Sequence, residues 1–364
     1  EIGVRLVGSE MCIRDRLVGE LSSFRKAALP FIAACGGMLF PVIVYMSICP
    51  PGSAGSQGLA IPMATDIAFS LGVLSLLGSR VPLSLKIFLT AFAVVDDIGG
   101  ILVIALFYSS HVSYGYILIA ALLYVLLYFI GKRGTTNKIF FLVIGVVIWY
   151  LFLQSGIHST ISGVILAFVI PAKPRLYVGK YIEHIRHTIA GFPVVESGSI
   201  VLTNEQIAKL KEVESASDRV ISPLQSLEDN LHGAVNYLIL PLFAFVNAGV
   251  VFSGGGELVG SVGMAVAAGL LFGKFAGIYF FTWLAIKIKL TPMPPGMTWK
   301  NLSGIALLGG IGFTVSLFIA NLSFGANYPV LLNQAKFGVL SGTILSGLLG
   351  YIVLRIVLPV RKRK

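Results

Sequence analysis

The sequence predicts an all-α polytopic membrane protein, and three observations support this fold class. Of the 364 residues, 56% are hydrophobic and only 12% are charged, whereas soluble domains carry about 25% charged residues. The mean hydropathy is +0.90, and apolar runs long enough to span a bilayer as helices, about 20 residues each, recur along the chain. Lys and Arg gather in the short gaps between these runs. A lipid bilayer is therefore the expected partner.

The basic excess could also indicate a nucleic-acid-binding protein, since 27 Lys and Arg residues stand against 16 Asp and Glu. Their confinement to the gaps between apolar runs argues against that class, and no nucleic-acid partner is expected. Three cysteines without the spacing of metal ligands argue against a disulfide scaffold or a zinc site.

About ten segments are predicted to span the membrane as helices. They cover residues 30–49, 60–78, 84–108, 114–131, 138–155, 156–171, 233–252, 260–286, 302–323 and 335–359. Lys and Arg occur in alternate gaps between these segments and in the C-terminal "RKRK" tail, which indicates an even number of spans. Because positively charged loops stay in the cytoplasm, both Leu17 and Lys364 are predicted to lie on the cytoplasmic side.

Residues 1–16 differ from the rest of the chain, because they show neither an apolar period nor helix caps. The stretch from Arg5 to Arg16 can be back-translated into a sequence that resembles a sequencing-library adapter. We therefore expect a non-native segment, followed near Leu17 by a native chain whose true beginning is missing. The alternative is a genuine polar N-terminus.

The remaining chain divides into three predicted parts. These are an N-terminal transmembrane part (17–171), a cytoplasmic loop (172–231) and a C-terminal transmembrane part (232–364). Within the loop, Thr203 is predicted to cap a polar helix that carries Glu205 in its first turn.

Four ionisable side chains lie well inside predicted spans: Asp66, Asp96, Asp97 and Lys274. A charge at the centre of a bilayer costs about 2.5–3.5 kcal/mol even on the mildest scales, so these residues are candidates for function. A buried ion pair that only holds helices together is the alternative. It fits poorly, because three acids share one base and the surplus negative charge has no fixed partner.

The adjacent acids Asp96 and Asp97 cannot both face the same neighbour, since successive helical residues point about 100° apart. One of them can pair with Lys274 while the other faces a water-filled path. Close carboxylates titrate as a coupled pair, and their oxygens are also suitable ligands for Na⁺ or Li⁺. A proton and a cation would then compete for one site, which is the chemical requirement of an exchanger.

Two spans are predicted to be interrupted near these charges. Pro62 precedes Asp66 by four residues and removes an intrahelical hydrogen bond. Gly309, Gly310 and Gly312 lie in the middle of another span, although glycine alone more often serves packing. Membranes tolerate broken helices only where protein or water satisfies the freed backbone groups. One such break in each half of the chain is a sequence indication of a transporter site.

Several blocks of this sequence resemble the NhaA-type sodium/proton antiporters. The matching blocks include "PMATDIAFSLG", "FAVVDDIGGILV", "GIHSTISGVILAFVIP", "LILPLFAFVNAGV" and "GGIGFTVSLFIANLSFG", in family order from Leu17 to the C-terminus. The family is itself a known example of inverted repeats. The resemblance implies twelve helices, two inverted three-helix repeats (here 30–108 and 260–359) and two interrupted helices that cross. About ten of the twelve helices are visible here.

The resemblance also implies roles for individual residues. Asp97 would be the principal Na⁺ or Li⁺ ligand, and Asp96 the second carrier, paired with Lys274 in one protonation state. Thr65 and Asp66 would shape the site and balance the helix dipole ends, with Thr314 in the second interrupted helix. Two further positions, Glu228 and His232, match residues linked to the family's pH response. Asp229 departs from the family's pattern there and weakens that assignment.

The predicted function is secondary active antiport, with Na⁺ or Li⁺ leaving the cytoplasm and protons entering. The resemblance implies electrogenic, pH-regulated exchange in a bacterial inner membrane, no cofactor beyond the transported ions, no enzymatic activity, and a homodimer as an option for the full-length parent. An intramembrane aspartyl protease fits poorly, because Asp96 and Asp97 are adjacent and follow two valines. An ion-coupled solute symporter of related fold is the main alternative, and Lys274 beside the acids argues against a passive cation channel.

Overall fold

A computed structural model describes residues 24–107, 112–133, 135, 138–171, 178–191, 203–220, 223–249, 260–325 and 327–359. These residues form helices and connections without any strand, so the predicted all-α class is confirmed for the described part of the chain. The chain divides into two compact units, one of Glu1–Tyr108 with Leu240–Lys364 and one of Ser109–Ile239. Residues 1–16, which we expect to be non-native, lie outside the described residues.

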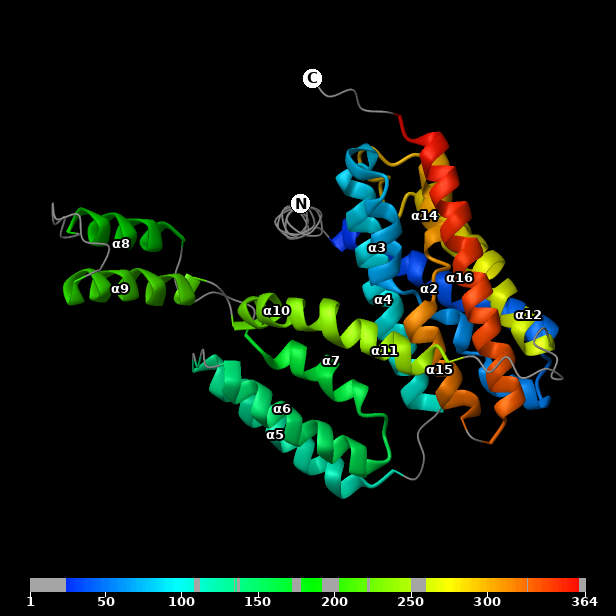
Figure 1. Ribbon diagram of the computed structural model, residues 1–364, viewed down its shortest axis with the longest axis horizontal. Helices are drawn as coiled ribbons and strands as arrows, with labels where there is room; N and C mark the ends of the chain where they lie inside the picture. Colours follow the sequence, from blue (N-terminus) through cyan, green and yellow to red (C-terminus); the bar gives the residue numbers. More distant parts are fainter. Residues whose placement is uncertain are drawn as a thin grey trace. The chain divides into compact units, whose positions relative to one another are not determined.

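All the predicted membrane charges belong to the first unit, whose helices are drawn in Figure 1. In chain order they are α2 (Phe24–Ile48), η1 (Ala54–Gly58), η2 (Ile61–Met63), α3 (Ile67–Ser75), η3 (Gly78–Arg80), α4 (Leu83–Phe107), α11 (Leu240–Asn247), α12 (Ser261–Ala268), η5 (Gly269–Gly273), α13 (Lys274–Lys287), α14 (Trp299–Leu308), α15 (Phe313–Phe324) and α16 (Pro329–Val357). Helix α16 packs against α12, α14 and α15, while α2 packs against α4, α12 and α13.

The second unit contains seven helical segments in its described residues. They are α5 (Tyr114–Lys132), α6 (Lys138–Ser155), α7 (Thr160–Val169), α8 (Val178–Ala190), α9 (Asn204–Val220), α10 (Pro223–Ala234) and the π-helical turn η4 (Val235–Ile239). Helices α5, α6 and α7 pack together, and α8 packs along α9 (Figure 1). The backbone amide of Gln206 donates to Thr203 Oγ1, which confirms the predicted cap of α9. Helices α8 and α10 were not predicted, because their polar composition resembles that of a connector.

Five helices in the described residues are long and apolar enough to span a membrane, and two bent helix pairs raise this number to seven. Helices α6 and α7 are apolar but shorter. The segment 156–171 forms a helix of only ten residues, which is shorter than predicted. The described part of the chain therefore contains several membrane-length apolar helices, and the total of ten spans stays a prediction.

Helix α16 begins six residues before the predicted start of its span, and this shift corrects the list of buried charges. Pro329 opens the helix, where its missing N–H is not needed. Lys336 consequently lies two turns inside α16 and is only 9% exposed. Four ionisable residues are predicted well inside the spans, and the structure adds Lys336 to them.

Candidate ion-binding site

Both predicted helix breaks are present, and each separates two short helical segments. The first runs from η1 and η2 into α3 through the extended residues 64–66, with a bend of 46°. The second separates α14 from α15, with a bend of 44°. Pro62 lies inside η2, while Gly309, Gly310 and Gly312 form the second break.

The glycines of the second break are required by close contacts. A Cβ atom at Gly310 would lie 2.3 Å from the carbonyl oxygen of Leu270, and one at Gly312 would lie 2.3 Å from Ser316 Oγ. Real Cβ contacts are almost never this short. Glycine is thus the residue that lets the break approach α15 and η5.

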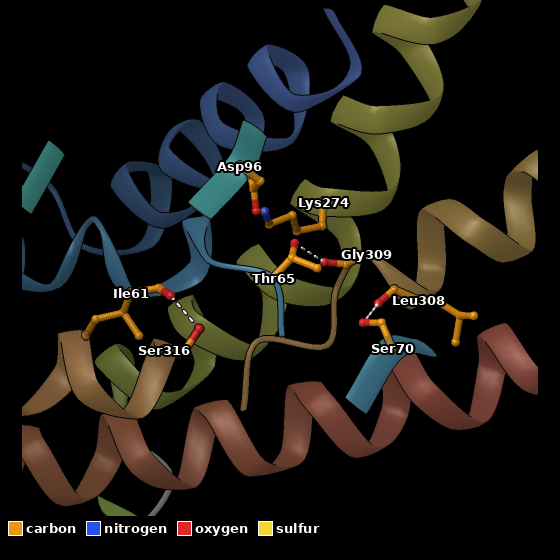
Figure 2. Close-up of polar contacts among 8 residues, drawn as sticks. All are labelled: Ile61, Thr65, Ser70, Asp96, Lys274, Leu308, Gly309 and Ser316. Carbon is orange, nitrogen blue, oxygen red and sulfur yellow. Dashed lines mark hydrogen bonds and ion pairs between the residues drawn. The ribbon is translucent and has the colours of Figure 1, made fainter. Parts of the chain in front are cut away.

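Hydrogen bonds connect the two breaks directly. Thr65 Oγ1 donates to the carbonyl oxygen of Gly309 at 2.8 Å (Figure 2). The backbone amide of Asp66 donates to the carbonyl oxygen of Ile311 at 2.6 Å. Because a bilayer core offers no water to unpaired backbone groups, each break satisfies part of the other.

Asp66 lies between the N-terminal ends of two half-helices. Its Oδ1 accepts a hydrogen bond from the amide of Phe69 in α3, at 3.1 Å. Its Oδ2 accepts from the amide of Thr314 in α15 at 3.0 Å and from the Thr314 hydroxyl at 2.5 Å. A carboxylate at a helix N-terminus satisfies a free amide and opposes the positive end of the helix dipole. Asp66, only 3% exposed, does this for two helices.

Lys274 pairs with Asp96 across two helices. Lys274 Nζ lies 2.5 Å from Asp96 Oδ2, and both side chains are fully buried (Figure 2). Lys274 is the first residue of α13 and follows the π-helical turn η5, while Asp96 lies on α4. The ammonium group also lies 5.7 Å from the ring centroid of Phe92. Breaking a buried pair of this kind leaves an uncompensated charge, at a cost of about 3–5 kcal/mol.

Asp97 lies next to this pair on α4 and is less deeply buried than Asp96. The Oδ1 atoms of both residues are buried and accept no hydrogen bond from any described residue. Buried polar atoms in native proteins almost always have a partner, and carboxylate oxygens are the ligands that hard cations prefer. These two oxygens can therefore receive either a cation or a proton.

The predicted pH-response residues lie elsewhere in the chain. Glu228 and His232 are on α10, in the unit Ser109–Ile239, and Glu228 is exposed. The side-chain amide of Asn236 lies 2.9 Å from His232 Nε2. Both residues thus belong to a different unit from the carboxylates.

Two serines that the sequence analysis missed contact the breaks. Ser70 Oγ donates to the carbonyl oxygen of Leu308 at 3.0 Å, and Ser316 Oγ donates to that of Ile61 at 2.8 Å (Figure 2). Each serine lies four residues beyond a predicted break residue: Ser70 follows Asp66, and Ser316 follows Gly312. That spacing could have placed each hydroxyl one turn into the half-helix that leaves the break, but it does not show which carbonyl group the hydroxyl meets.

Comparison with known proteins identifies the family. The family model described as Na+/H+ antiporter 1 matches residues 5–354. The chain belongs to this family. It is 98% identical over 359 residues to a Bacteroides thetaiotaomicron protein named Na(+)/H(+) antiporter NhaA. The matched region covers 99% of this chain and 82% of that protein.

More distant members of the Na+/H+ antiporter 1 family match almost the whole chain as well. A Bacteroides fragilis protein with the same name is 79% identical over 357 residues, with 98% of this chain and 82% of that protein covered. A Saccharophagus degradans protein named Na(+)/H(+) antiporter NhaA 1 is 42% identical over 352 residues, with 95% of this chain and 75% of that protein covered. The broken helices and the paired carboxylates described above thus belong to a member of this family.

Proposed function

We propose that this chain is a secondary active Na⁺/H⁺ antiporter that exports Na⁺ or Li⁺ from the cytoplasm in exchange for protons. The observation that carries this proposal is the asymmetry of the two adjacent carboxylates. Each has a buried oxygen without a partner in the described residues, but Asp96 is paired with Lys274 through its other oxygen, whereas Asp97 has no ion pair with a described residue. Family membership and the names of the relatives support the same function.

In the proposed mechanism, Asp97 is the principal cation ligand and Asp96 the second. A cation bound between them competes with the Lys274 ammonium group for Asp96 and with protons for the free oxygens. Protonation removes the negative charge that holds the cation and releases it, so one site alternates between the two ions. The proposed exchange moves more than one proton per Na⁺ and is electrogenic, as the resemblance to the family implies.

Thr65, Asp66 and Thr314 hold the surrounding backbone in this proposal. Alternating access would expose the carboxylates to one side of the membrane at a time. The breaks would remain closed to lipid, because their backbone groups are paired with each other. Sodium is the transported substrate in this proposal, and no resident cofactor takes part.

We also propose the twelve-helix fold with inverted repeats at 30–108 and 260–359. The paired breaks, one in each half of the chain, support this arrangement. So do the reciprocal bonds from Ser70 to Leu308 and from Ser316 to Ile61, since inverted repeats exchange equivalent contacts.

The distribution of Lys and Arg supports an inner-membrane protein with Leu17 and Lys364 on the cytoplasmic side. A homodimer and a pH response through Glu228 and His232 are further proposals.

Ion exchange in everted membrane vesicles tests this function. Vesicles are prepared from cells that lack their own Na⁺/H⁺ antiporters and express the chain, and an imposed proton gradient is followed with a fluorescent dye. Addition of Na⁺ or Li⁺ is expected to collapse the gradient, whereas K⁺ is not. Variants with both Asp96→Asn and Asp97→Asn should not respond. Uptake of an organic solute without Na⁺/H⁺ exchange would contradict the proposal and favour a symporter, which no observation on this chain supports.

A further inference from the structure

The two serines at the crossing donate hydrogen bonds to backbone carbonyl groups of other helical segments. Leu308 is the last residue of α14, and Ile61 belongs to the three-residue helix η2. The last carbonyl groups of any helix have no partner within that helix. Water, the usual substitute, is excluded from the bilayer core. Ser316 Oγ supplies a hydrogen bond to the Ile61 carbonyl. Ser70 Oγ supplies a second one to the Leu308 carbonyl, which also accepts the backbone amide of Ile311 at 3.1 Å, and both serines are fully buried.

Each hydroxyl group links the second half of one broken helix to the first half of the other. Ser70 ties α3 to α14, and Ser316 ties α15 to η2 (Figure 2). Helix α3 begins directly after Asp66, and α15 receives the second oxygen of the same carboxylate through Thr314. The two serine bonds therefore limit how far the half-helices that share Asp66 can separate.

We propose that Ser70 and Ser316 are positioning residues of the ion site, which act by holding the two broken helices in register around Asp66. Their hydroxyl groups touch neither carboxylate of the Asp96–Asp97 pair, and they act through the backbone that carries Thr65 and Thr314. This inference rests on the proposed antiport function for its kinetic consequence. Its structural consequence, a crossing that loosens without the hydroxyl groups, does not depend on that function.

A different serine provides a matched control. Ser341 Oγ donates to the carbonyl oxygen of Phe337, which lies on the same helix α16. Ser341→Ala therefore removes a hydroxyl-to-carbonyl bond within one helix, whereas Ser316→Ala and Ser70→Ala each remove one that crosses between segments. The three variants lose the same atom, from a fully buried site at Ser70 and Ser316 and from a partly buried one at Ser341.

The experiment compares Na⁺ exchange kinetics in everted vesicles for the wild type and these three variants. Loss of one neutral hydrogen bond corresponds to a change of about three- to tenfold in an equilibrium constant. We expect Ser316→Ala and Ser70→Ala each to raise the KM for Na⁺ by about this factor, with a smaller change in kcat. Ser341→Ala should stay at the wild-type KM. Ser316→Thr and Ser70→Thr keep the hydroxyl group and should recover most of the affinity.

Hydrogen exchange of the purified proteins, followed by mass spectrometry, gives a readout that needs no activity. Peptides spanning residues 61–70 and 307–316 should exchange faster in Ser316→Ala and Ser70→Ala than in Ser341→Ala. If the wild type shows no Na⁺-dependent exchange, the antiport proposal fails, while faster hydrogen exchange in the serine variants would still support their positioning role. If the wild type is active and the crossing variants match Ser341→Ala in both KM and hydrogen exchange, the inference is overturned.

Discussion

Asp66 and Thr314 are 248 positions apart in the sequence, yet one carboxylate oxygen of Asp66 accepts both the backbone amide and the hydroxyl group of Thr314. The other oxygen caps α3. Asp66 is therefore committed to the backbone of the two breaks, unlike Asp97, which has a buried oxygen without a described partner. Of the three acids predicted inside the membrane, Asp66 holds the backbone of the breaks and Asp96 pairs with Lys274. Asp96 and Asp97 each keep a buried oxygen available for a cation.

Substitution of Asp66 should reduce stability in proportion to the caps that are lost. Each lost N-cap costs about 1 kcal/mol, so Asp66→Ala should lower the free energy of unfolding by about 2 kcal/mol. Asp66→Asn retains one oxygen and should fall between this variant and the wild type. Thermal melting in detergent, followed by circular dichroism, measures the order. Glu228→Gln, at an exposed position, is the control, and equal melting of Asp66→Ala and the wild type would contradict the double cap.

The Asp96–Lys274 pair should show strong coupling between its partners. Lys274→Met leaves the Asp96 carboxylate buried without its cation, which costs about 3–5 kcal/mol. The double variant Asp96→Asn with Lys274→Met removes both charges and should recover much of this stability. Melting curves of the two single variants and the double variant give the coupling energy. Additive effects would show that the two groups do not stabilise each other.

The same double variant separates a structural pair from a functional one. If the pair only held helices together, the recovered protein would exchange Na⁺ at the wild-type rate. We expect it to melt near the wild type and to lose Na⁺-dependent exchange in everted vesicles, because one of the two proposed cation ligands is gone. A stable double variant with normal exchange would assign the pair to structure alone.

Asp97→Asn should abolish exchange without lowering stability. Asp97 has a buried oxygen without a described partner, so the substitution removes a desolvated negative charge and should leave the melting temperature equal or higher. The proposed principal ligand is lost at the same time, and Na⁺-dependent collapse of the proton gradient should disappear. Retained exchange with an unchanged KM for Na⁺ would remove Asp97 from the site.

The sequence predicts the breaks but not the contacts between them, and the reason is physical. Pro62 and the three glycines of the second break (Gly309, Gly310 and Gly312) act locally, because they remove a hydrogen bond or permit close approach wherever the chain then goes. The bonds of Ser70 and Ser316 depend on which helix ends lie opposite, and residue spacing alone does not contain that information.

The two buried lysines show the same limit of prediction from the sequence. Lys274 lies in the middle of a long apolar run, so its burial follows from the sequence alone. Lys336 lies near the predicted edge of its span, and its burial depends on a helix start at Pro329. In the structure its ammonium group donates to the carbonyl oxygen of Gly249 at 3.0 Å, a partner from another segment. The pattern of apolar residues does not show where a helix with a polar first turn begins.

The contact between α2 and α13 should tolerate no side chain at its centre. A Cβ atom at Gly277 would lie 2.1 Å from the carbonyl oxygen of Gly36, a backbone atom that cannot move aside. Gly277→Ala should therefore destabilise the protein by at least about 1–3 kcal/mol and displace Lys274, one turn earlier on α13. Gly72→Ala on α3 is the matched control, because a Cβ atom there meets nothing within 4 Å. Alanine is favoured over glycine within a helix by about 0.5–1 kcal/mol, so this control should melt slightly higher than the wild type. Melting curves that show Gly277→Ala as stable as Gly72→Ala would contradict the close approach of the two helices.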